Sequence, residues 1–120
     1  MAQFALAGVH VIDKGTVRYV FSGADANAVT AAVHAYFAWR GYALEEGTAA
    51  NGAYGKGSEV SRALLGGLAT RFKFKVAVYY GDGAVLVDFS KGMSGLVGGA
   101  LGVSKMNKEF AAIQEGLKAL

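Results

Sequence analysis

The sequence has 120 residues, the size of one domain, and no stretch in it resembles a linker between two domains. It contains no cysteine, which excludes disulfide bonds, thiolate metal sites and cysteine nucleophiles. The net charge is only +3, so a mild basic bias between Lys56 and Lys108 is the only electrostatic indication of an anionic partner. We therefore expect a single domain over residues 1–120.

Two features indicate a soluble, cytoplasmic protein without a membrane span. The N-terminal residues Met1 to Leu6 lack the basic region and long apolar core of a secretory signal. The uncharged stretch from Gly92 to Ser104 has 13 residues, which is shorter than the ~20 needed to span a bilayer.

The chain also has 18 glycines and no proline, so glycine is expected to supply its turns.

A β-hairpin is predicted at the start of the chain. The runs Gln3–Ile12 and Thr16–Ser22 favour strands, and Lys14-Gly15 between them favours a turn. Large apolar residues alternate along the second run, so one face of that strand is expected to be buried. These residues are Val17, Tyr19 and Phe21.

The next predicted element is a helix from about Ala26 to Arg40. Apolar residues recur there at spacings of three and four, which forms one apolar stripe. Either Ser22 or Asp25 can cap the start of this helix, and Gly41 occupies the usual position after its last turn.

The middle of the chain predicts smaller elements. A short strand is expected over Tyr42–Glu46, followed by a hairpin turn at Asn51-Gly52, where both residues tolerate positive φ. A short helix is predicted for Ser58–Ala69, although Gly66-Gly67 costs about 1 kcal/mol per glycine inside a helix.

The clearest local prediction is a hairpin from Arg71 to Ser90 that turns at Asp82-Gly83. In this register Tyr80 pairs with Val85, and most of the large apolar residues share one face: Phe74, Val76, Val78, Tyr80, Val85, Val87 and Phe89. A register shifted by one residue would mix apolar and charged side chains. The opposite, solvent-facing side would carry Lys73, Lys75, Ala77, Tyr79, Leu86, Asp88 and Ser90.

The C-terminal part contains a glycine-rich apolar segment, Gly92–Gly102, and an amphipathic helix, Ser104–Ala119. We interpret the segment as a tight connection packed against the sheet, with a ligand, membrane-surface or dimer contact as the alternatives. The sequence does not decide whether residues 92–103 are helical. The fold class is thus predicted to be α+β: an antiparallel sheet of five or six strands, packed on one face by two amphipathic helices, with a shorter third helix.

No catalytic apparatus, metal site or cofactor site is predicted. The glycine-rich segment contains neither the phosphate-loop pattern nor the dinucleotide-binding pattern. The two histidines, His10 and His34, have no accompanying ligand motif, which makes a zinc site improbable. No serine lies in a nucleophile-elbow context.

Two candidate binding surfaces remain, a basic strand and the glycine-rich segment. The basic side chains would meet an anionic ligand, and the glycines would allow close approach. The leading hypothesis is a non-enzymatic binding or interaction module that takes an anionic ligand or a protein partner, with self-association through an edge strand or the Gly/Ala surface as a variant. The candidate residues are Arg62, Arg71, Lys73, Lys75, Gly95, Gly98, Gly99 and Gly102.

Two alternative functions are retained. The first is nucleic-acid binding through the basic strand 71–75, where Phe72 and Phe74 alternate with lysines. The predicted register disfavours it, because the phenylalanines face away from the lysines and cannot form a stacking platform beside them. The second is a small ligand carrier or enzyme with a pocket between the sheet and the helices.

Overall fold

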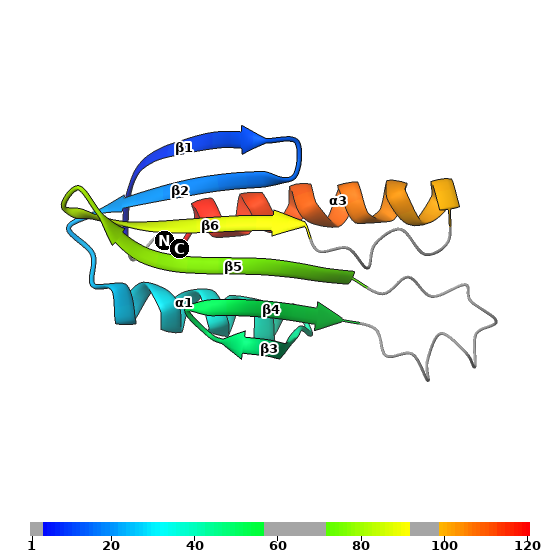
Figure 1. Cartoon of the computed structure of the whole chain (residues 1–120), viewed down its shortest axis with the longest axis horizontal. Helices are drawn as coiled ribbons and strands as arrows, with labels where there is room; N and C mark the ends of the chain where they lie inside the picture. Colours follow the sequence, from blue (N-terminus) through cyan, green and yellow to red (C-terminus); the bar gives the residue numbers. More distant parts are fainter. Residues whose placement is uncertain (1–3, 57–71, 92–98) are drawn as a thin grey trace.

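The computed structural model describes residues 4–56, 72–91 and 99–120, and every structural statement below refers to these residues. They form six strands and two helices (Figure 1). No described helix is both long enough and apolar enough to cross a membrane. The elements are β1 (Ala5–Asp13), β2 (Thr16–Ser22), α1 (Ala26–Trp39), β3 (Ala43–Thr48), β4 (Asn51–Lys56), β5 (Phe72–Gly81), β6 (Ala84–Lys91) and α3 (Gly99–Lys118).

The six strands form one antiparallel sheet with the order β1-β2-β6-β5-β4-β3. Three hairpins build it: β1–β2, β3–β4 and β5–β6. The pairing of β2 with β6 joins the first hairpin to the last, and β4 joins the middle hairpin to β5. As a result β1 and β3 are the two edges of the sheet (Figure 1).

Helices α1 and α3 pack on one face of the sheet, which we call the covered face. Alternate side chains of the central strands meet the apolar stripes of both helices there, because strand side chains point to opposite faces in turn. The first described residue lies beside the last, since the Phe4 amide donates to the Leu120 carbonyl over 3.1 Å. Fully buried members of this core include Tyr19, Phe21, Val29, Val33, Phe37, Phe74, Val87, Phe89, Ile113 and Leu117.

The predicted register of the β5–β6 hairpin is confirmed. Tyr80 pairs with Val85, and the two-residue turn is Asp82-Gly83. Both turn residues have positive φ, 52° and 77°, as expected for a turn whose twist matches the flanking strands. Phe74 is fully buried on the covered face, so the alternation of side chains follows the prediction.

The first hairpin and the first helix also agree with the sequence. Lys14-Gly15 separates β1 from β2, and the Gly15 amide donates to the Asp13 carboxylate over 2.8 Å. Asp25 is the N-cap of α1, because its carboxylate accepts from the Ala28 amide over 2.9 Å. Gly41 follows the helix with φ 94°, the left-handed conformation that ends many helices.

The predicted set of three helices is wrong: the described residues contain two, α1 and α3. The apolar stripes of these two helices already cover the core strands, so the covered face does not depend on a third helix. The predicted short helix at 58–69 lies outside the described residues.

The start of the last helix was also predicted too late. Helix α3 begins at Gly99 and not at Ser104, so Gly99 and Gly102 belong to the helix and not to a connection. Glycine costs about 1 kcal/mol inside a helix, and the C-terminal half of α3 is anchored by buried residues such as Ile113 and Leu117. A helix that is anchored by buried residues in its C-terminal half can therefore include glycines near its start.

The turn predicted at Asn51-Gly52 is wrong. The middle hairpin turns at Ala49-Ala50, and Asn51 pairs with Thr48 as the first residue of β4. Gly52 is required for a different reason, because a Cβ at this position would collide with the carbonyl oxygens of Glu46 and Thr48. The glycine therefore allows two backbones to approach, which sequence patterns do not distinguish from a turn.

Candidate functional site on the open face of the sheet

The face of the sheet opposite α1 and α3, which we call the open face, contains a hollow of ≈ 390 Å³ over β4, β5 and β6. Its floor includes Ala53 and Ala77, which face Lys75 and Asp88 of the neighbouring strands. Ala53 is buried but does not belong to the core cluster, as expected for a residue under the open face. The polar side chains that line the hollow are Glu46, Asn51, Lys75, Asp88 and Ser90.

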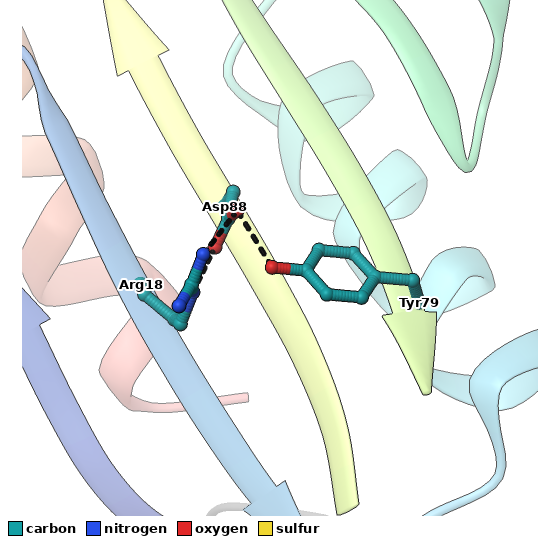
Figure 2. Close-up of polar contacts among 3 residues, drawn as sticks. All are labelled: Arg18, Tyr79 and Asp88. Atoms are coloured by element: carbon teal, nitrogen blue, oxygen red, sulfur yellow. Dashed lines mark hydrogen bonds and ion pairs between the residues drawn. The ribbon is translucent and has the colours of Figure 1, made fainter. Parts of the chain in front are cut away.

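Asp88, which lines this hollow, belongs to a cluster of three polar side chains with Arg18 and Tyr79 (Figure 2). Arg18 on β2 lies directly opposite Asp88 on β6 and binds it with two hydrogen bonds, of 2.8 Å from Nε and 3.1 Å from Nη2. Tyr79 on β5 donates its hydroxyl to the same carboxylate over 2.8 Å. The carboxylate of Asp88 therefore accepts three hydrogen bonds, from donors on both neighbouring strands.

These contacts determine how the cluster titrates. Partial burial works to raise the pKa of Asp88, but the hydrogen bonds from Arg18 and Tyr79 outweigh it and hold the pKa below its ordinary value. Burial, followed by the hydrogen bond to Asp88, raises the pKa of the Tyr79 hydroxyl. At neutral pH the carboxylate is therefore ionised and the phenol protonated.

A second ion pair lies at the other side of the hollow. The Lys73 ammonium contacts a Glu46 carboxylate oxygen at 3.0 Å, and the Glu46 side chain is 63% exposed. Glu46 is opposite Ala53 on the edge strand β3, so the pair spans from β3 across β4 to β5. Like Asp88, Glu46 has a cationic partner of its own.

Three donors of the hollow have no such partner. Among the described residues, no hydrogen bond or ion pair engages the ammonium of Lys75, the side-chain amide of Asn51 or the hydroxyl of Ser90. Lys75 and Ser90 are directly opposite each other on β5 and β6. The unused hydrogen-bonding capacity of the hollow is therefore biased towards donors and carries positive charge.

The structure separates the predicted site residues. Lys73 and Lys75 lie on the open face as predicted, but only Lys75 lines the hollow without an ionic partner among the described residues. Gly99 and Gly102 are in α3, on the other side of the sheet. The remaining candidates, Arg62, Arg71, Gly95 and Gly98, lie outside the described residues.

Sequence reasoning missed Arg18, Asn51 and Glu46. Asp88 and Ser90 were placed on the lysine side of the β5–β6 hairpin, because local alternation is sufficient for that assignment. Arg18 reaches the same face through the β2–β6 pairing, which joins residues 70 positions apart. Its neighbour in the sequence, Tyr19, is buried on the covered face, and that alternation was the only signal that Arg18 faces outward.

The described residues contain no group of three or more histidine or acidic side chains arranged to hold a metal ion. His34 instead contacts the Tyr54 hydroxyl through Nδ1 at 3.0 Å.

Comparison with known proteins finds no matching family model, no matching curated protein and no matching solved structure. The proposals below therefore depend on the chemistry of this chain alone.

Proposed function

We propose that the chain is a non-enzymatic binding module that takes a small anionic ligand in the hollow of the open face, with Lys75 as its cationic contact. The observation that carries this proposal is the set of three unpartnered donors, Lys75, Asn51 and Ser90, around a floor of small residues. A carboxylate or phosphate group supplies the acceptors that such a set lacks.

The carboxylates of the hollow support the same ligand class. Asp88 already accepts hydrogen bonds from Arg18 and Tyr79, and Glu46 is paired with Lys73. The negative charge of each carboxylate is therefore balanced by a cationic neighbour, which weakens its attraction for a cationic ligand. A volume of ≈ 390 Å³ is within the range of small-molecule sites, which extends from roughly 300 to 1,000 Å³.

The geometry gives less support to nucleic-acid binding. Phe74 is buried on the covered face, and Phe72 packs against the same core, so neither phenylalanine can stack on a base beside Lys73 and Lys75. Tyr79 is an aromatic residue of the open face, but its hydroxyl is bound to Asp88. A pocket between sheet and helices is also less favoured, because stacked aromatic rings such as Phe89 and Phe110 occupy that layer.

The proposal is tested by titrating inorganic phosphate and succinate into isotopically labelled protein and following backbone amide shifts. We expect saturable shifts along β5 and β6 around Lys75, with dissociation constants of about 1 mM or lower. Lys75→Ala should abolish them. Lys108→Ala, which removes an exposed lysine from α3 on the other side of the sheet, is the matched control and should leave them unchanged.

Three results would overturn the proposal. One is the absence of saturable binding for both anions, and another is binding that Lys75→Ala leaves intact. The third is tight, strongly salt-dependent binding of a short oligothymidylate in preference to both anions, which would favour a nucleic-acid interface.

A further inference from the structure

The edge strand β1 differs from the other strands in having an uncharged, apolar stretch with only one neighbour. Strand β1 spans nine residues and pairs only with β2 among the described strands. Residues Ala5 to Ile12 include no Lys, Arg, Asp, Glu or Pro. Natural edge strands usually carry such residues, because an unprotected edge pairs with other strands.

The opposite edge shows the usual protection. Strand β3 carries Glu45 and Glu46, with a register irregularity between Leu44 and Glu46, and Gly47 has a φ of 73°. Charged side chains discourage pairing with a further strand. Because β1 also has register irregularities, between Leu6 and Gly8 and between Val11 and Asp13, the two edges of the described sheet differ mainly in charge, and β1 is the edge that lacks acidic and basic side chains from Ala5 to Ile12.

The side chains of β1 add an exposed apolar strip. Val9 is 37% exposed and Val11 is 74% exposed. They pair with Tyr19 and Val17, which are buried on the covered face, so both valines lie at the outer margin of that face. Ile12, at the end of the strand, is 48% exposed.

We propose that two copies of this chain associate through β1, which pairs antiparallel with its own equivalent about a two-fold axis at His10. The two valines flank His10, so this register places Val9 of each copy opposite Val11 of the other and covers both apolar positions at once. The regular part of β1, Gly8–Val11, includes all three residues. A two-fold axis perpendicular to the sheet keeps the helices of both copies on the same side.

The charges of the strand agree with this partner. The contact carries no Lys, Arg, Asp or Glu between Ala5 and Ile12, so two identical strands meet without like-charge repulsion from these residue types. Apolar strips arranged symmetrically about His10 match each other in a two-fold contact, whereas an unrelated extended peptide would need a matching strip of its own. The second copy is therefore the partner that this edge fits.

The first test is the mass of the protein in solution, measured by sedimentation from micromolar to hundreds of micromolar concentrations. We expect a species of twice the chain mass of 12.4 kDa. Val11→Lys should yield the monomer with an unchanged circular dichroism spectrum, because the Val11 side chain is mostly outside the core. Trp39→Lys, at an equally exposed position on α1, is the matched control and should remain dimeric.

The second test uses the absence of cysteine from the chain. Residues directly opposite across strands have Cβ atoms about 4.5–5.5 Å apart, close to the spacing of a disulfide. His10→Cys should therefore form an intermolecular disulfide on mild oxidation, whereas Thr48→Cys on the β3 edge should not. A mixture of Val9→Cys and Val11→Cys chains should give the mixed dimer in preference to either homodimer.

A wild-type monomer at all these concentrations would overturn the proposal. So would a dimer that persists in Val11→Lys, since its interface would then lie elsewhere. A dimer that is lost in Val11→Lys but is not linked by His10→Cys would overturn the pairing centred on His10.

Discussion

Along β6, the side chains of Val85, Val87 and Phe89 are fully buried beneath the helices, whereas Leu86 and Asp88 of the same strand face the open side. The covered face is stabilised by removal of apolar surface from water, which is large and non-directional. The open face is organised by specific polar pairs, whose contribution is small where solvent reaches them. Stability is therefore concentrated on one face, and the other can carry a binding site at little cost to the fold.

The largest expected effect comes from breaking the covered face. Phe89→Ala should lower the free energy of unfolding by about 3–5 kcal/mol, because it removes a fully buried ring that stacks on Phe110. Leu86→Ala on the open face of the same strand should cost only about 1 kcal/mol. Urea denaturation of both variants measures the difference, and equal losses would contradict the assignment of stability to one face.

The next effect concerns the packing of the two helices. A Cβ at Gly116 of α3 would collide with the ring and hydroxyl of Tyr36 on α1. Gly116→Ala should therefore destabilise the protein by about 1–3 kcal/mol, although helix propensity alone predicts a gain of about 1 kcal/mol.

The control for this clash is a comparison of three variants by thermal or urea denaturation: Gly116→Ala, Tyr36→Ala and the double variant. The double variant should lose less stability than the sum of the single variants, because removal of the ring relieves the collision. A stabilised Gly116→Ala protein would show that the two helices pack less closely than the structure indicates.

A smaller effect is expected at the Asp82-Gly83 turn. This turn fixes the β5–β6 register and therefore the face of the sheet on which each side chain lies. Gly83 has a φ of 77°, so Gly83→Ala strains the β5–β6 turn and should cost about 1 kcal/mol or slightly more. Asp82→Asn should remain within about 0.5 kcal/mol of the wild type, because asparagine also tolerates positive φ. Denaturation midpoints of the two variants test this, and a neutral Gly83→Ala would argue against the turn.

The smallest effect should appear as acid sensitivity of the open face. The folded protein holds the pKa of Asp88 below its ordinary value. Its contribution to stability is therefore present above the ordinary aspartate pKa of about 4 and is lost as pH falls through the folded value. Asp88→Asn removes this contribution, so its melting temperature should fall less steeply than that of the wild type below about pH 4. Identical slopes in the two proteins would show that the cluster adds no acid-sensitive stability.

Local patterns were sufficient for several elements. The alternation along β5 and β6 and the Asp82-Gly83 turn predicted the hairpin, and they placed Lys75 on the open face. Capping residues predicted the ends of α1. These predictions succeeded because each depends on interactions between residues close together in the chain.

The same reasoning failed for glycine, because this residue occurs in several kinds of local structure. Gly52 was taken for a turn residue, but it allows close contact between β3 and β4. Gly99 and Gly102 were taken for a connection, but they lie in α3. A glycine is compatible with a turn, a close approach or an anchored helix, and neighbouring residues do not decide among them.

The sequence by itself determined the β1–β2 and β5–β6 hairpins, the first helix and the face on which Lys73 and Lys75 lie. Only the tertiary structure decided that β2 pairs with β6, which brings Arg18 to Asp88, and that β1 lies at an edge of the sheet. Hairpin register depends on neighbouring residues and short turns. Strand order depends on how two helices and six strands together bury their apolar faces, and that requirement acts on the whole chain at once.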